Sequence, residues 1–184
     1  MEKEYGREHM NLPSNRYFLL GAPGAGKGTM ERCIVKQLGM KCGAIVVSDL
    51  LNTKEMEQMK DQGLLINDRI VVEILLKQLL DPIYRNGCII DGFPRSFVQS
   101  NIIANLHKYI TNWRQEYSGS ARDTHFRMIV LYVDEATSIQ RQLDRGRFIE
   151  QHNQKVLQTG DGNLQELRKT DCSAEAAQLR YMYF

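Results

Sequence analysis

The chain has 184 residues, of which 42% are hydrophobic and 25% are charged, which is typical of one ordinary globular domain with small insertions. The formal net charge is +2, so no global field favours nucleic acid or an anionic membrane as a partner. Residues 1–15 are polar and charged, and the longest apolar runs, such as 128–133, are too short to span a bilayer. We therefore expect a cytoplasmic protein that binds neither membrane nor nucleic acid and begins with a flexible tail over 1–15.

Neither the cysteines nor the histidines follow the spacing of metal ligands. This pattern argues against a structural zinc site. We expect the cysteines to act as small apolar fillers of the core. They are Cys33, Cys42, Cys88 and Cys172.

A glycine-rich loop over 21–29, with the sequence G-A-P-G-A-G-K-G-T, follows the apolar run 17–20 and precedes a segment with apolar residues at helical spacing. Strand, glycine loop and helix in this order predict a phosphate-binding loop. Glycines let backbone N–H groups close on phosphate oxygens, and the helix N-terminus adds a partial positive charge. Lys27 is expected to reach the terminal phosphates, and the Thr29 hydroxyl to bind Mg²⁺. The predicted nucleotide-binding residues are Gly21, Ala22, Pro23, Gly24, Ala25, Gly26, Lys27, Gly28 and Thr29.

Strands and helices alternate along the rest of the chain. Strands are expected over 44–47, 87–91 and 126–133, and helices over 50–62, 66–79, 96–113, 136–143, 151–157 and 173–184. The strands are apolar throughout, which predicts an α/β fold with a parallel sheet covered by helices on both faces, in three layers. Ligands bind at the carboxyl ends of such strands. The phosphate loop lies at one such end, and Asp49, Asp91 and Asp134 follow other strands.

Residues 88–99, with the sequence C-I-I-D-G-F-P-R-S-F-V-Q, resemble the adenylate kinase signature of three apolar residues, D-G-F-P-R and a Gln four positions later. With the phosphate loop, the chain resembles the nucleoside monophosphate kinase family from about Tyr17 to its end. The resemblance implies a phosphate-loop kinase fold, with a reduced acceptor-binding subdomain over about 48–77 and a short lid over about 145–168. It also implies reversible transfer of the γ-phosphoryl group of ATP, with Mg²⁺, to AMP, giving two ADP.

The resemblance also implies roles on the acceptor side. Arg95 would clamp the acceptor phosphate through a guanidinium fork, and Asp91 would orient Mg²⁺ through a water. Gln99 would bind the acceptor adenine, and Gln at this position favours AMP over pyrimidine nucleotides. Other positions that resemble the AMP site are Val47, Asn52, Leu65, Ile66 and Gly92.

Several arginines resemble those that hold the transferred phosphates and the lid. Arg141 and Arg145 share a helix face and resemble the R-x-x-x-R that opens the lid, with a hinge expected around Gly146. Arg168 resembles the start of the motif that closes the lid, and Arg180 resembles the last phosphate arginine. Lid closure would exclude water from the reaction.

The chain departs from the family pattern at three places. Asn52 stands where the family has an arginine that binds the AMP phosphate. Unless another cation compensates, the loss of this arginine predicts roughly 10- to 100-fold weaker AMP binding or catalysis. Lys54 is the nearest cation in the sequence that could compensate. Val47 replaces a threonine, the segment 52–63 is short and 105–125 is long. The family also continues past the position of Phe184 with an edge strand and a helix, which predicts a divergent or C-terminally truncated member.

Two alternatives stay open. One is a nucleotide-binding module with little or no transfer activity, as part of a larger chain or assembly. The other is a kinase for another nucleoside monophosphate. A GTPase is disfavoured because the chain has no N-K-x-D motif. ATP and AMP are the expected partners, and a monomer is the expected state.

Overall fold

The structure is a computed structural model that describes residues 13, 15–53, 56, 66–116 and 125–184. Lys54, Leu65 and most of the predicted tail lie outside these residues, as does part of the long segment 105–125. The chain forms two compact units. The first comprises Met1–Leu20 and Gly28–Val130, and the second comprises Gly21–Lys27 and Leu131–Phe184.

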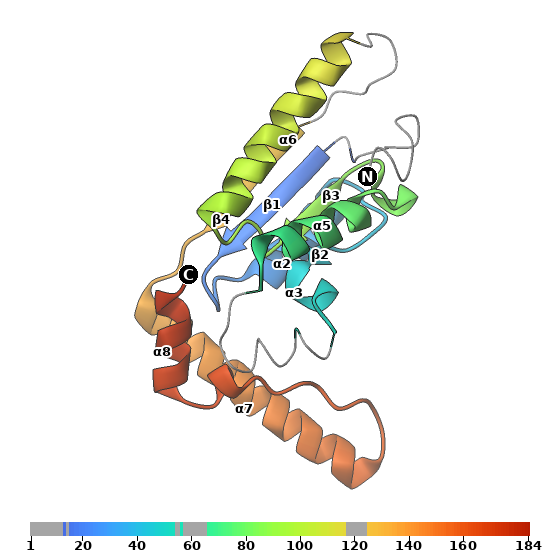
Figure 1. The fold of residues 1–184 in the computed structure, drawn as a ribbon. Helices are drawn as coiled ribbons and strands as arrows, with labels where there is room; N and C mark the ends of the chain where they lie inside the picture. The colour runs from blue at the N-terminus through green and yellow to red at the C-terminus, as the bar shows by residue number, and fades with distance from the viewer. Residues whose placement is uncertain (1–12, 14, 54–55, 57–65, 117–124) are drawn as a thin grey trace. The chain divides into compact units, whose positions relative to one another are not determined.

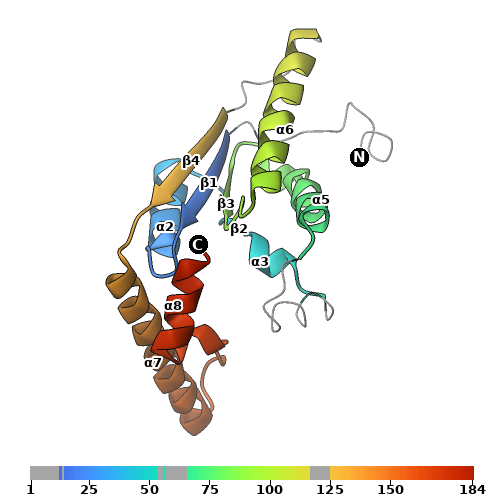
Figure 2. The same ribbon diagram turned by 60° about the vertical axis from the view of Figure 1, so that its left-hand side comes forward.

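The first unit is built on a sheet with the strand order β2-β3-β1-β4. The strands are β1 (Asn15–Gly21), β2 (Ile45–Val46), β3 (Cys88–Asp91) and β4 (His125–Leu131). β3 pairs in parallel with β1 and with β2, and β4 points in the same direction as β1 (Figure 2). The predicted α/β fold with a parallel sheet is thus confirmed.

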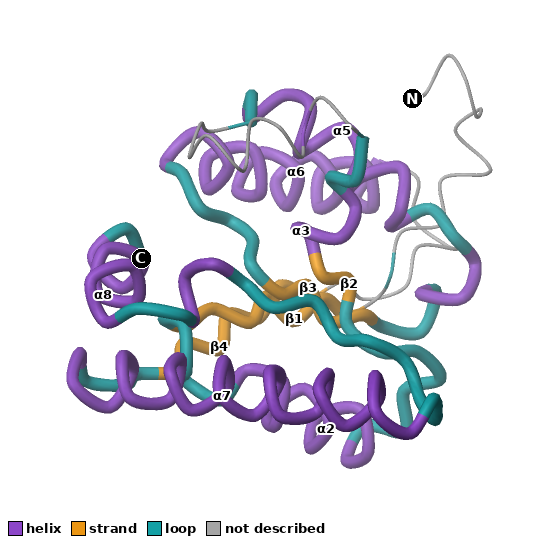
Figure 3. Tube along the Cα trace, turned by 90° about the horizontal axis from the view of Figure 1, so that it is seen from below, coloured by secondary structure: helices purple, strands orange, loops and turns teal. Residues whose placement is uncertain are grey.

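Helices cover both faces of this sheet (Figure 3). α5 (Asp68–Leu79) and α6 (Phe97–Glu116) lie on one face, and α2 (Lys27–Gln37) lies on the other. Asn67 caps α5 by accepting a hydrogen bond from the Arg69 N–H at 2.9 Å. The predicted strand over 44–47 is shorter than expected because α3 (Val47–Leu50) begins at its last residue. A short 3₁₀ helix, η2 (Pro82–Tyr84), leads into β3.

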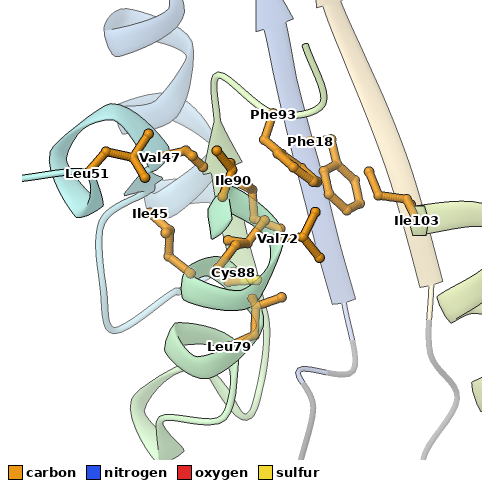
Figure 4. Packing of buried hydrophobic residues seen from close by; sticks show 12 residues of the cluster. Phe18, Ile45, Val47, Leu51, Val72, Leu79, Cys88, Ile90, Phe93 and Ile103 are labelled. Atoms are coloured by element: carbon orange, nitrogen blue, oxygen red, sulfur yellow. The ribbon is translucent and has the colours of Figure 1, made fainter. Parts of the chain in front are cut away.

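The apolar core of this unit lies between the sheet and the helices α5 and α6 (Figure 4). Phe18 is 2% exposed, and its ring centroid lies 5.9 Å from that of Phe126 and 6.5 Å from that of Phe93. Ile90 is fully buried on the neighbouring strand, and Ile103 of α6 closes the cluster beside Phe18. These contacts fix β3 and α6 on either side of the segment 92–96 that joins them.

The prediction that the cysteines fill the core is wrong for three of the four. Cys88 is buried, but Cys33 and Cys172 are exposed and Cys42 is half-buried. Cys33 lies on α2, none of whose residues is buried. Its helical spacing predicted the helix correctly but did not show how little of the helix is covered.

The second unit consists of α7 (Glu135–Thr159), the 3₁₀ helix η3 (Lys169–Asp171) and α8 (Ala174–Met182), together with residues 21–27. α8 lies alongside α7 (Figures 1 and 2). Asp134 caps α7 by accepting from the Thr137 N–H, and Gly160 ends it in the left-handed conformation at φ 69°. Segment 160–168 runs back along the helix, where the Asn153 side chain accepts from the Gln165 N–H and donates to its carbonyl.

α7 is one continuous helix, although the sequence predicted separate helices over 136–143 and 151–157. The hinge expected around Gly146 lies inside this helix. A Cβ at Gly146 would overlap the Asp171 carbonyl oxygen, so the glycine is explained by close packing between α7 and η3. No helix in the described ranges is both long and apolar enough to cross a membrane.

Gly146 offers a direct test of this packing. We expect Gly146→Ala to lower the free energy of unfolding by about 1–3 kcal/mol, because the methyl group must displace η3. Urea denaturation measures the change.

The matched control is Gly28→Ala, which places a methyl group on another helical glycine. A Cβ at this position would have no neighbouring atom within 4 Å. The variant should leave stability unchanged or raise it by up to about 1 kcal/mol. Equal stability of the Gly146→Ala variant and the unmodified protein would contradict the close packing.

Candidate active site

The glycine loop joins β1 to α2 through backbone conformations that favour glycine. Gly24 has φ 76° and Gly26 has φ 89°, values that side chains rarely allow. The Ala25 N–H donates to the Ala22 carbonyl at 3.1 Å and closes the turn. Because α2 begins at Lys27, the N–H groups of its first turn have no partner within the helix. This is the arrangement that binds anions at a helix N-terminus.

Lys27 places an ammonium group against the loop itself. Its Nζ donates to the Gly21 carbonyl at 2.7 Å and lies 3.5 Å from the Ala22 carbonyl. The side chain is half-buried, whereas Thr29 in the next turn is exposed. Lys27 is thus held at the loop, where the sequence predicts phosphate binding.

The first turns of α7 hold the loop from the side. The Ser138 hydroxyl donates to the Pro23 carbonyl at 2.7 Å, and Arg141 Nη1 donates to the Gly24 carbonyl at 2.9 Å. A Cβ on Gly24 would lie 3.1 Å from the Ser138 carbonyl oxygen. The sequence predicted Arg141 but missed Ser138, whose only signal was its place three residues earlier on the same helix face.

A buried carboxylate joins two more of the predicted arginines, Arg145 and Arg180. Asp171 is 2% exposed and accepts from Arg145 Nε at 2.7 Å and from Arg145 Nη2 at 2.6 Å. Arg180 Nη1 lies 3.6 Å from the same carboxylate and donates to the Thr170 hydroxyl at 3.0 Å. Asp171 follows Arg168 in the motif that the sequence singled out, but it was not predicted as a site residue. Arg168 itself is exposed at the N-cap of η3.

In the first unit, three of the predicted acceptor residues, Gly92, Arg95 and Gln99, follow the carboxyl end of β3. Gly92 has φ 79°, and a Cβ there would lie 2.6 Å from Arg95 Nη2. Arg95 Nε donates to the Gly92 carbonyl at 2.7 Å, and the side chain is exposed. The glycine therefore lets the guanidinium lie against the turn with its remaining N–H groups available for a ligand.

Gln99 is buried, at 5% exposed, in a polar network that joins α5 to α6. Its Oε1 accepts from the Arg95 N–H at 2.7 Å, and its Nε2 donates to Asp68 Oδ1 at 2.7 Å. Ser96 Oγ donates to Asp68 Oδ2 at 3.0 Å. Binding of a base by the Gln99 amide would require it to share or exchange these partners. The sequence missed Asp68 and Ser96, although Ser96 lies beside Arg95.

The other predicted acceptor positions differ in their surroundings. Val47 is 4% exposed in the core and Ile66 packs against that core, so the Val47 side chain itself contributes to packing. Asn52 is exposed, and Leu65 lies outside the described residues. Asp91 is half-buried at the end of β3. The oxygens of Thr29 and Asp91 are of the kind that Mg²⁺ prefers, with phosphates and water completing its shell.

Comparison with known proteins matches these features to one family. A sequence model described as adenylate kinase matches residues 19–153. An adenylate kinase of Prochlorococcus marinus is 31% identical over 142 residues, covering 72% of this chain and 70% of the relative. One of Caldicellulosiruptor saccharolyticus is 36% identical over 98 residues, and one of Methylobacterium radiotolerans is 35% identical over 100 residues. Each of these two matches covers 50% of this chain and about half of the relative, 46% and 49%.

The family match begins within β1 and ends within α7, so it includes the phosphate loop, the D-G-F-P-R turn and the first lid arginines. Arg168 and Arg180 lie beyond it, although the structure joins Arg180 to Arg145 through Asp171. The family model matches more than half of the chain, and the Prochlorococcus marinus relative is 31% identical and covered over 70% of its length. The chain therefore belongs to the adenylate kinase family.

Proposed function

We propose that this protein transfers the γ-phosphoryl group of MgATP to AMP and forms two ADP in a reversible reaction. The observation that carries the proposal is the second unit, where the phosphate loop, Lys27 and Arg141 are joined by hydrogen bonds. Arg145 lies one turn farther along α7 and Arg180 is joined to it by Asp171. Cations gathered around a phosphate loop suit phosphoryl transfer, in which the protein positions and neutralises rather than reacting covalently.

Each cation has a defined task in this proposal. Lys27 and Arg141 bind the donor phosphates, and Arg145, Arg168 and Arg180 neutralise the charge of the group in transfer. Thr29 and Asp91 would hold Mg²⁺, Asp91 through water, and the ion would offset the negative charge of the phosphates. A lid over about 145–168 would keep water from the reaction.

On the acceptor side, Arg95 binds the phosphate and Gln99 binds the adenine, within a subdomain over about 48–77. The exposed Arg95 guanidinium can make two charge-assisted bonds to a phosphate. We expect the protein to act as a cytoplasmic monomer on these small molecules alone.

The experiment that tests the proposal is a coupled assay of ADP formation from MgATP with AMP, GMP, CMP or UMP, and an ATP-only control. We expect AMP-dependent turnover of about 1–100 s⁻¹. Turnover with GMP, CMP or UMP in place of AMP would show that the acceptor is another nucleoside monophosphate. If the folded protein binds ATP but shows no acceptor-dependent turnover, the result would instead favour a nucleotide-binding module. Asn52, which stands in place of the family's phosphate-binding arginine, is the reason to test this alternative.

The donor role of Lys27 predicts the effect of its removal. Lys27→Met should lower kcat about 10²–10³-fold, because a positioned cation is lost from the transition state. The control is Lys36→Met, an exposed lysine in the last turn of the same helix, which should keep full activity. Equal turnover of the two variants would remove Lys27 from the donor site.

The acceptor role of Arg95 predicts a different kinetic pattern. Arg95→Met should raise the KM for AMP or lower kcat/KM for AMP by roughly 10- to 100-fold, because a charge-assisted contact is lost, with little change in the KM for ATP. Arg85→Met removes another exposed arginine of the same unit and should have no effect. An Arg95→Met enzyme with unaltered AMP kinetics would refute the assignment.

Asn52 allows a gain of function to be tested. Asn52→Arg should raise kcat/KM for AMP roughly 10-fold or more, because it restores a charged donor for the acceptor phosphate. Because Asn52 is exposed, the substitution should change the free energy of unfolding by no more than about 0.5 kcal/mol. Asn52→Met controls for side-chain length, and an equal response of both variants would show that charge at this position does not matter.

A further inference from the structure

Two polar side chains of α7, those of Ser138 and Gln142, are fully buried one helical turn apart, and neither has a part in the reaction as proposed above. Gln142 Nε2 donates to the Ser138 hydroxyl at 3.3 Å and to the carbonyl of Ala177 on α8 at 3.2 Å. The Ser138 hydroxyl in turn donates to the Pro23 carbonyl in the phosphate loop at 2.7 Å. A continuous chain of hydrogen bonds therefore runs from α8 through α7 to the loop, and all of it lies within the second unit.

The partners of Gln142 determine which way its amide points. The Ala177 carbonyl can only accept a hydrogen bond, so the amide nitrogen must face it. The Ser138 hydroxyl gives its one hydrogen to Pro23, so it can only accept from Gln142. The amide oxygen of Gln142 is left buried, and no residue in the described ranges donates to it. An unpaired buried oxygen destabilises the folded state, so stability does not explain why a glutamine stands at this position.

What the amide does provide is a fixed direction for the Ser138 hydroxyl. A serine hydroxyl rotates to suit its surroundings, and within a helix it can also donate to a carbonyl of the preceding turn. The bond from Gln142 Nε2 occupies a lone pair of the hydroxyl oxygen, which favours the rotamer whose hydrogen meets the Pro23 carbonyl. Gln142 thus acts on the phosphate loop through Ser138.

The carbonyl held by this hydroxyl belongs to a peptide of the glycine loop whose N–H group is a potential phosphate ligand. The Pro23–Gly24 peptide is trans and planar, so the Pro23 carbonyl and the Gly24 N–H point in opposite directions. A carbonyl held toward α7 therefore directs the Gly24 N–H away from α7. A Cβ on Gly24 would lie 3.1 Å from the Ser138 carbonyl oxygen, so the helix packs directly on this peptide. In glycine loops of this kind, the backbone N–H groups are the ligands of the phosphates.

We propose that Gln142 is a positioning residue for the phosphates of ATP. Through Ser138 it fixes the Pro23–Gly24 peptide, so that the Gly24 N–H is directed at a phosphate oxygen. This role rests on the proposed function, because the loop must hold the donor phosphates for the peptide to meet one. Since the same amide also bonds to α8, it ties the loop to the helix that carries Arg180.

The affinity of the full chain for MgATP, measured by titration calorimetry well below the Tm, tests the proposal. Gln142→Met and Ser138→Ala should each raise the Kd about 3- to 10-fold, as expected for the loss of one ordinary hydrogen bond. The Gln142→Met, Ser138→Ala double variant should bind no more weakly than Ser138→Ala alone, because Gln142 acts through that hydroxyl. The Tm of Gln142→Met should stay within about 3 °C of that of the unmodified protein. A purely structural role would instead lower the Tm and leave the Kd unchanged.

The matched control is Gln140→Met. Gln140 is exposed on the same helix, and its amide donates to Asp144 Oδ1 at 3.0 Å. Removal of this amide should leave the Kd for MgATP unchanged. Equal affinity of Gln142→Met and the unmodified protein would overturn the proposal, as would a double variant whose weakening is the product of the two single effects.

The side-chain amide signal of Gln142 in the NMR spectrum of the unmodified protein decides the matter even if Gln142→Met does not fold. Hydrogen-bonded groups in a chain polarise one another, so saturating MgATP should shift this signal. A signal that stays in place would refute the link between Gln142 and the loop. Failure of the proposed function looks different: a protein that binds MgATP without transferring phosphate refutes that function alone, whereas one that binds no MgATP refutes both.

Discussion

The carboxylate of Asp171 is the constraint on which the second unit depends. A buried charge is tolerated only where charged or hydrogen-bonding partners replace the water that it loses. Asp171 meets this requirement by drawing Arg145 from α7 and Arg180 from α8 to one point. The close approach of η3 to α7 that this requires is possible because position 146 has no side chain. One buried carboxylate thus explains the glycine, the position of η3 and the clustering of two arginines that would otherwise repel each other.

In the first unit, the buried polar group at the centre of the network is a neutral amide, the side chain of Gln99. Gln99 is buried and joins Asp68 of α5 to the backbone of Arg95. Because both ends of the amide are in use, the turn that carries Arg95 is tied to two helices that pack on the apolar core. A polar network with every member paired is rigid. The position of Arg95 is therefore determined by the packing of α5 and α6 rather than by the turn alone.

Sequence reasoning predicted what depends on local pattern. Continuous apolar runs and helical spacing located the four strands and the helices α2, α5, α6 and α8. The loop over 21–29 and the turn over 91–95 are recognised directly from their sequence motifs. It missed Ser138, Asp68 and Asp171 as site residues, because their importance comes from contacts between residues 26 to 115 positions apart along the chain. The packing role of Gly146 was missed for the same reason: a glycine in a helix indicates either flexibility or close packing, and the contact with the Asp171 backbone can be seen only in the structure.

The partners of two predicted phosphate-binding arginines, Arg141 and Arg95, explain how each can be held in position and still bind a phosphate. Arg141 and Arg95 each donate to a backbone carbonyl, of Gly24 and Gly92 respectively. A carbonyl is a neutral acceptor, whereas a phosphate oxygen forms a charge-assisted bond that is roughly twice as strong. Exchange of one for the other is therefore favourable, and little is lost when the carbonyl is released to other donors. Arg145 differs, because its two bonds to the buried Asp171 are already charge-assisted. It follows that phosphate binding should shift the Arg141 and Arg95 side chains and leave Arg145 on its carboxylate, with only its outer face directed to the substrate.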